Sequence, residues 1–240
     1  MNRCVLVFAA TVMAATALIA AELPDGWVKE PFDGKSLAGW AVKRPAEKSK
    51  WAVGVARLPA DNIKTLVAED IPEGKKGALV NEVSGHRQSV DIFTKAEWAD
   101  CHLEIEVMVA KGANSGIYMM GEYEIQILDS YGKTKIGAGD MGGIYGASPA
   151  RVNAAGEAGT WQKYVVDFQA PRFDDTGKKI ANARFLRVEL NGKVIHEDVE
   201  LKGSTGGSLP GPERPKGPLM FQGDHGPVAY RNIEVTPLKK

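Results

Sequence analysis

A run from Glu122 to Asp129 places carboxylates and an amide at strand-like spacing. Alternate side chains of an extended strand point to opposite faces, so Glu124 and Gln126 share one face, and the isoleucines that alternate with them share the other. The isoleucines fit a hydrophobic core, which leaves Glu124 and Gln126 to project together from the opposite face. A carboxylate there could act as an acid or a base, and the amide could bind a hydroxyl group.

The last carboxylate of this run, Asp129, lies five residues after Glu124. That offset is odd, so Asp129 reaches the same face only if the strand bulges near Leu128. Alternating polar residues of this kind more commonly form the solvent-exposed face of a strand. The run by itself leaves both interpretations open.

A second polar group, Phe221 to Pro227, forms a short loop between two strand-like runs. Its His225 lies between glycines and ionises near neutral pH, so it could donate or accept a proton. The alternative is a structural turn in which Asp224 bonds its own backbone. Arg231, in the strand-like run that follows, could reach the same cleft as an orienting or oxyanion-binding group.

Aromatic residues are concentrated near these polar groups in the sequence. Aromatic rings stack on the apolar faces of sugars, but they also fill protein cores. Tyr123 shares the core side of its strand with Ile125, so the stacking candidates are Tyr118, Tyr131, Tyr145 and Trp161. Trp40 and Trp51 are interpreted as core residues.

The elements that must position these residues are β-strands. Short alternating runs are interrupted by Gly, Pro and Asn, and no long stretch has helical periodicity. Asn191-Gly192 joins two such runs and predicts a hairpin with a type I′ turn. Two Gly-rich segments, 130–158 and 202–217, are predicted to be loops, where binding residues concentrate. The pattern predicts an all-β fold of two packed antiparallel sheets.

The 240 residues contain 30 Lys and Arg and 30 Asp and Glu, with 44% hydrophobic residues. Balanced charge argues against nucleic acid or an anionic membrane as the partner and favours a neutral, polar one. The sequence has no phosphate-binding loop, serine-hydrolase elbow, zinc-protease helix or EF-hand motif. Carboxylates and carbonyls near Glu124 and Asp129 could hold calcium, but no calcium-loop spacing is present. The metal and the oligomeric state stay open, and no cofactor is required.

The N-terminus has the order of a secretory signal: a positive charge at Arg3, an apolar run over 5–19, and small residues at Ala20 and Ala21. We therefore predict a signal peptide at 1–21 and export to the periplasm or the extracellular space, with no membrane anchor. The remaining residues, 22–240, are predicted to form one domain. Its single cysteine, Cys101, is interpreted as a small buried hydrophobe.

Eight segments in this order resemble the 3-keto-disaccharide hydrolase domain family over nearly all of the mature chain. They are Phe32–Trp40, Trp51–Val53, Phe93–Asp100, Asn114–Tyr118, Tyr123–Asp129, Gly143–Gly146, Gly159–Gln162 and Gln222–Ile233. The resemblance implies a concanavalin A-like jelly-roll sandwich, bacterial export and hydrolysis of glycosides oxidised to a ketone at C3. The segments 202–217 and 171–183 depart from the family pattern, which leaves the leaving group and the sugar preference open.

This substrate class suggests a mechanism, because a ketone at C3 acidifies the proton at C2. A base can remove that proton, the group at C1 departs by elimination, and water then adds back. We expect Glu124 to be the base, Asp129 or His225 the acid, and Gln126 and Arg231 the orienting or oxyanion-binding groups. Further substrate contacts are expected from Asn114, Tyr145 and Trp161.

The spacing Glu124-x-Gln126-x-x-Asp129 also resembles the catalytic strand of laminarinase-type glucanases, Glu-x-Asp-x-x-Glu. Glutamine replaces the middle acid here, and the last acid is shorter. Both changes disfavour ordinary retaining hydrolysis, which needs two carboxyl groups about 5 Å apart. The alternative function is a non-catalytic, lectin-like carbohydrate-binding module, since this fold hosts binders as well as enzymes.

Overall fold

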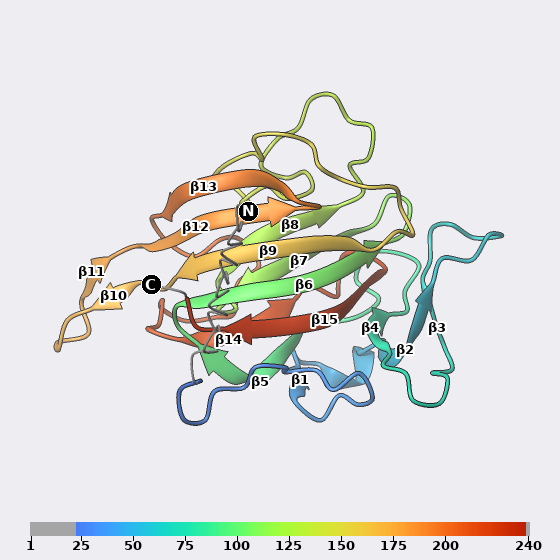
Figure 1. Cartoon of the computed structure of the whole chain (residues 1–240), viewed down its shortest axis with the longest axis horizontal. Helices are drawn as coiled ribbons and strands as arrows, with labels where there is room; N and C mark the ends of the chain where they lie inside the picture. Colours follow the sequence, from blue (N-terminus) through green and yellow to red (C-terminus); the bar gives the residue numbers. More distant parts are fainter. Residues whose placement is uncertain (1–22, 239–240) are drawn as a thin grey trace, which may run out of the picture.

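Most strands of this protein belong to two sheets that pack against each other (Figure 1). Apolar residues that alternate along these strands form the core. The computed structural model describes residues 23–238, and every strand pairing within them is antiparallel. This confirms the predicted all-β sandwich. The predicted signal peptide, 1–21, lies outside the described residues, so export stays a prediction. No helix within residues 23–238 has the length and apolarity needed to cross a membrane.

The smaller sheet has five strands and carries the strand that contains Glu124. In spatial order these strands are β1 (Trp40–Val42), β5 (Ile92–Trp98), β14 (Gly217–Phe221), β7 (Asn114–Met119) and β8 (Tyr123–Leu128). A short 3-10 helix, η1 (Ala46–Lys48), follows β1.

The larger sheet has eight strands. Their spatial order is β13 (Lys193–Leu201), β12 (Ala183–Leu190), β9 (Gln162–Gln169), β6 (Cys101–Val109), β15 (Val228–Thr236), β4 (Ala78–Asn81), β2 (Trp51–Arg57) and β3 (Val67–Glu69). A separate hairpin consists of β10 (Arg172–Phe173) and β11 (Lys179–Ala181).

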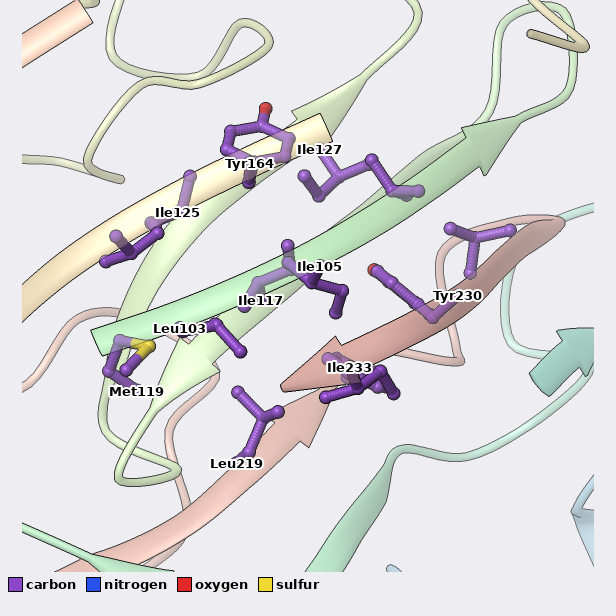
Figure 2. Close-up of a cluster of buried hydrophobic side chains, with 14 of the residues drawn as sticks. Leu103, Ile105, Ile117, Met119, Ile125, Ile127, Tyr164, Leu219, Tyr230 and Ile233 are labelled. Carbon is purple, nitrogen blue, oxygen red and sulfur yellow. The ribbon is translucent and has the colours of Figure 1, made fainter. Parts of the chain in front are cut away.

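The hydrophobic core lies between the two sheets (Figure 2). Leu103 and Ile105 project into it from β6, and Ile117 and Ile125 project from β7 and β8; all four are at most 1% exposed. Burial of this apolar area is the main force that holds the sheets together. As predicted, the isoleucines of β8 face the core.

Several local sequence predictions are confirmed. Asn191 and Gly192 connect β12 to β13 with φ of 52° and 75°, as a type I′ turn requires. Trp40 and Trp51 are buried in the core. Cys101 is also buried, and burial raises the pKa of its thiol to about 12, so it behaves as a hydrophobe at neutral pH.

The last two strands of the chain, β14 and β15, join different sheets and so determine which distant segments lie together. β14 pairs between β5 and β7 in the smaller sheet, and β15 pairs between β6 and β4 in the larger sheet. The connection between them, residues 222–227, therefore crosses from one sheet to the other beside the N-terminal end of β7. This crossing brings His225 close to Asn114.

Candidate active site

A pocket of about 180 Å³ opens on the outer face of the smaller sheet, over β7, β8 and β14. Polar side chains, two tyrosines and two glycines line it: Asn114, Tyr118, Glu124, Gln126, Tyr145, Gly206, Gly207, Gln222 and His225. The structure thus brings together five of the eight predicted site residues and leaves three outside. We call this space the polar pocket.

Strand register sets the position of Glu124. Tyr118 pairs with Glu124, and Gly116 pairs with Gln126, so all four lie on the face opposite the core isoleucines. Gly116 leaves the space that the Glu124 carboxylate occupies, because a β-carbon there would overlap its Oε1 atom. Glu124 therefore leans across β7 toward the centre of the polar pocket.

One long loop lies along the edge of β8 and carries Tyr145. The backbone N–H of Gln126 donates to the Gly143 carbonyl at 2.8 Å, and the N–H of Tyr145 donates to the Glu124 carbonyl at 3.1 Å. These bonds hold Tyr145 at the rim, where its side chain stays 44% exposed and faces Gly206. An exposed ring fixed at a pocket rim can stack on a sugar.

The predicted loop 202–217 forms the opposite wall. The Thr205 hydroxyl accepts from the N–H of Glu124 at 2.9 Å, and the Tyr118 hydroxyl donates to the Gly206 carbonyl at 3.0 Å. At Gly207, φ is 80°, and a side chain would collide with the Tyr118 hydroxyl. This loop therefore shapes the pocket mouth, whereas the 171–183 segment forms β10 and β11 and does not line the pocket.

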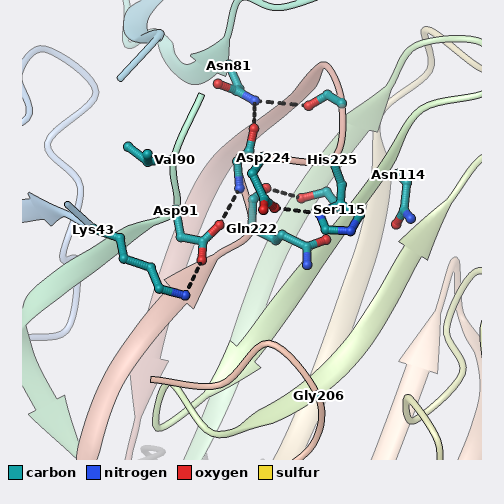
Figure 3. Close-up of polar contacts among 12 residues, drawn as sticks. Lys43, Asn81, Val90, Asp91, Asn114, Ser115, Gly206, Gln222, Asp224 and His225 are labelled. Atoms are coloured by element: carbon teal, nitrogen blue, oxygen red, sulfur yellow. Dashed lines mark hydrogen bonds and ion pairs between the residues drawn. The ribbon is translucent and has the colours of Figure 1, made fainter. Parts of the chain in front are cut away.

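The turn that carries His225 is fixed by buried polar side chains (Figure 3). The Asn81 amide donates to the carbonyls of Gly223 at 2.7 Å and Gly226 at 3.0 Å. The Gly223 N–H donates to Asp91 at 3.0 Å, and the Ser115 hydroxyl donates to the carbonyl of residue 222 at 2.7 Å. Buried, satisfied networks of this kind hold a site in one geometry.

Burial and neighbouring charges give Glu124 and His225 complementary acid–base properties. Burial raises the pKa of Glu124 to about 7, although the Tyr118 hydroxyl and His225 act in the opposite direction. A hydrogen bond with Asp224 raises the pKa of His225 above its usual value, against the effect of burial. Burial thus brings the pKa of Glu124 to about 7, and the hydrogen bond with Asp224 favours the protonated form of His225.

The structure places Asp129 outside the polar pocket, which corrects the expectation that it joins Glu124. The β7–β8 register runs without a bulge from Asn114 opposite Leu128 to Met119 opposite Tyr123. Asp129 consequently keeps the opposite parity and pairs with Lys111 at 2.9 Å. Within residues 23–238, no three His, Cys, Asp or Glu side chains converge as metal ligands would.

Arg231 and Trp161 also lie away from the pocket, contrary to expectation. Arg231 pairs with Glu106 at 2.6 Å, and its guanidinium lies 4.1 Å from the centre of the Trp161 ring. Glu106 alternates with the core residues Ile105 and Val107 on β6, so this group occupies the outer face of the larger sheet. The hydrophobic core therefore separates it from Glu124.

We expect Asp129→Asn to lower stability and leave activity in place. Burial would raise the pKa of Asp129, but Lys111 and the Gly112 N–H outweigh it and hold that pKa below its usual value. A depressed carboxyl pKa contributes stability above the unfolded-state value near 4, and that contribution is lost as pH falls through the folded-state pKa. Urea unfolding at pH 7 should show a loss of roughly 1–3 kcal/mol.

The same unfolding measurement at about pH 3 should show a smaller difference between Asp129→Asn and wild type. Full stability at pH 7 combined with a large loss of turnover would contradict this assignment and return Asp129 to the site.

Two contributors to the pocket were not predicted from the sequence. Gln222 lines it while only 9% exposed, and Asp224, interpreted only as a turn residue, partners His225. Tyr118, a predicted stacking candidate, does line the pocket, as a buried side chain whose hydroxyl bonds the Gly206 carbonyl. Gln222 lies two residues after Met220, which pairs with Tyr118. Because side chains two residues apart in a strand point to the same side, the alternation along β14 could have placed Gln222 on the outer face of the smaller sheet. No local signal shows that β14 lies beside β7, because that pairing joins residues about a hundred positions apart.

Comparison with known proteins gives one family match. The model of the 3-keto-alpha-glucoside-1,2-lyase-like domain matches residues 26–236. The crystal structure of a "putative glycosyl hydrolase" from Parabacteroides distasonis is 27% identical with a TM-score of 0.63, over 86% of this chain and 82% of that one. A second structure with that description and organism is 16% identical with a TM-score of 0.56, over 87% and 92%, and is similar in fold. No curated protein has a significant match.

Proposed function

Because this chain belongs to the 3-keto-alpha-glucoside-1,2-lyase-like domain family, we propose that it cleaves 3-keto-glycosides by elimination between C1 and C2. Hydration of the product would then give net hydrolysis. The family match confirms the resemblance found in the sequence. The observation that carries the proposal is that one small polar pocket holds both a buried carboxylate, Glu124, and a histidine, His225, that is hydrogen-bonded to an aspartate.

In the elimination step, the Glu124 carboxylate takes the proton from C2, and the electron pair moves onto the C3 oxygen as an enolate. When the ketone reforms, the C1–O bond breaks with its electrons on the leaving oxygen, which takes the Nε2 proton of His225. The products are a 1,2-unsaturated 3-keto sugar and an alcohol. Glu124 ends protonated and His225 ends neutral.

Hydration restores both groups to their starting states. Neutral His225 takes a proton from water as the water oxygen bonds to C1, and Glu124 returns its proton to C2. Atoms balance as 3-keto-glycoside plus water giving 3-keto sugar plus alcohol. One carboxylic acid and one imidazole are therefore sufficient for the acid–base steps, and no second carboxylate is needed.

Amides of the polar pocket can stabilise the enolate and bind hydroxyl groups. The Gln126 amide donates to the Asn114 side-chain oxygen at 2.6 Å, which fixes both groups. The Asn114 nitrogen and the Gln126 oxygen keep bonding capacity for a sugar. A neutral donor held next to developing negative charge stabilises it without reorganisation. Tyr145 at the rim supplies the stacking surface.

Pocket size favours a single sugar ring. A volume of about 180 Å³ is smaller than the roughly 300–1,000 Å³ of sites for drug-sized ligands. The 3-keto sugar fits inside, and the leaving group must extend beyond it. This is consistent with cleavage of a disaccharide or glycoside one unit at a time.

The test is turnover of a 3-keto-glucoside in D₂O. We expect release of the aglycone together with deuterium at C2 of the sugar, since elimination and rehydration break and remake that C–H bond. Nuclear magnetic resonance measures the deuterium, and an enzyme-free sample corrects for spontaneous exchange next to the ketone. Aglycone release without C2 exchange and without a C2 isotope effect would contradict elimination. Saturable sugar binding without release would instead support the lectin-like module.

A further inference from the structure

A second pocket, of about 350 Å³, is lined in part by Asp224, the partner of His225. Its lining is strongly basic: Lys43, Arg44, Pro45, Lys48, Arg87, Ser89, Val90, Asp91 and Asp224. We call this space the basic groove. Asp224 lines the basic groove and the next residue lines the polar pocket, so the two spaces share one wall.

The acidic groups of the basic groove are already neutralised. Asp91 pairs with Lys43 at 3.0 Å, and Asp224 pairs with His225. Arg44, Lys48 and Arg87 are exposed, and none has an ion-pair partner among residues 23–238. Three uncompensated cations around one depression attract an anion. This local excess of positive charge is not visible in the net charge of the whole chain, which is zero.

The basic groove is structurally continuous with the proposed proton donor. The backbone N–H of Arg87 donates to the backbone carbonyl of Asp224 at 2.6 Å, and the centre of the His86 ring lies 4.4 Å from the centre of the His225 ring. Figure 3 shows the row that runs from Lys43 past Asp91 and Asp224 to His225. A ligand that extends past His225 on the Asp224 side therefore meets the basic groove.

Resting on the proposed function, we propose that the basic groove is a leaving-group subsite that binds an anionic substituent, a carboxylate or a sulfate, of the glycoside being cleaved. The polar pocket holds one sugar ring, and the proton donor lies at the leaving oxygen, so the leaving group continues past His225. Arginine side chains bind carboxylates and sulfate-like anions through paired hydrogen bonds, and lysine adds charge. The preferred substrate is consequently a 3-keto-glycoside with an acidic leaving group.

The experiment compares three aryl 3-keto-glucosides that differ only in the para substituent: carboxylate, sulfonate or neutral carboxamide. We expect kcat/KM for the better anionic substrate to exceed that for the carboxamide by about fivefold or more at low salt. The preference should shrink as salt is added, because the screening length falls to about 10 Å at 0.1 M. The carboxylate and sulfonate arms distinguish an acidic sugar from a sulfated one.

Two variants test the basic groove: the single substitution Arg87→Gln, and the double substitution Arg44→Gln and Lys48→Gln. Each should remove the preference for the anionic substrates and leave turnover of the carboxamide substrate unchanged. Lys193→Gln is the matched control, because Lys193 is exposed at the β12–β13 hairpin, at the other end of the larger sheet. Equal kcat/KM for all three substrates, or a preference that survives in the groove variants, would overturn the subsite.

A binding arm separates this inference from the proposed function. Affinities of the same three glucosides for Glu124→Gln, measured by calorimetry, report the basic groove without any chemistry. Tighter binding of an anionic glucoside, abolished by the groove substitutions, supports the subsite even if no substrate is turned over. Indifferent binding overturns the subsite even if the carboxamide is cleaved efficiently.

Discussion

Glu124→Gln should lower kcat/KM for a 3-keto-glycoside by roughly 10²–10⁴-fold, the range that a positioned general base contributes. Glutamine keeps the size of the side chain and fits beside Gly116, but its amide cannot accept the C2 proton. Stopped-flow or steady-state assays of aglycone release measure the loss. Glu73→Gln is the matched control, because Glu73 is exposed in the turn between β3 and β4.

The pH profile should identify the same group. Burial raises the Glu124 pKa to about 7, so wild-type kcat/KM should increase as pH rises through about 7. At higher pH it should fall again as His225 loses its proton, and the two groups titrate as a coupled pair. Residual activity of Glu124→Gln should lack the acidic limb. A variant with near-wild-type turnover and an unchanged acidic limb would remove Glu124 from the mechanism.

Stability measurements separate a catalytic loss from a folding defect. A carboxyl group whose folded-state pKa is raised stabilises the fold below its unfolded-state pKa, and this contribution is lost as pH rises through the folded-state value. Glu124→Gln should therefore be more stable than wild type at about pH 8, with the difference vanishing below about pH 4. Such a variant would combine lost activity with increased stability, which a misfolded protein cannot do.

His225→Gln should reduce activity by an amount that depends on the leaving group. An alkyl alcohol leaves poorly without protonation, so its 3-keto-glucoside should lose roughly 10²–10³-fold in kcat/KM. The 4-nitrophenyl glucoside should lose far less, because nitrophenolate departs readily as an anion. A plot of log kcat/KM against leaving-group pKa should consequently become steeper in the variant.

The control for this prediction is His102→Gln. His102 pairs with Asp167 at 2.6 Å on the outer face of the larger sheet and takes no part in the polar pocket. An equal loss for every leaving group in His225→Gln would show that the histidine positions the substrate without donating the proton. Loss of the alkaline limb of the pH profile in the variant would support the donor role.

The orientation of Glu124 and Gln126 could be predicted from sequence because it follows from a period of two. The isoleucines of β8 point into the core, so the side chains that alternate with them must point to the opposite face of the sheet. The Asn191-Gly192 turn is local in the same sense, because two residues with positive φ decide it. The glycines around His225 likewise indicated a tight turn.

Asp129 shows where local reasoning ends. Whether Asp129 faces Glu124 depended on a bulge in β8, and the pairing with β7, together with the ion pair to Lys111, keeps the strand regular.

The overall charge of the sequence likewise does not show where charges gather in the fold. Equal numbers of acidic and basic residues favoured a neutral partner, but the fold gathers Arg44, Lys48 and Arg87 around one depression.

The sequence by itself determined the sandwich, the face on which Glu124 lies and the family. Tertiary structure alone decided which residues share the pocket, because that depends on which sheet each strand joins. β14 enters the smaller sheet and carries Gln222 and the His225 turn to Glu124. β15 enters the larger sheet, so Arg231, only six residues after His225, lies beyond the hydrophobic core. The pairing of distant strands depends on how the whole chain packs, so the six positions from His225 to Arg231 do not by themselves indicate which sheet each residue joins.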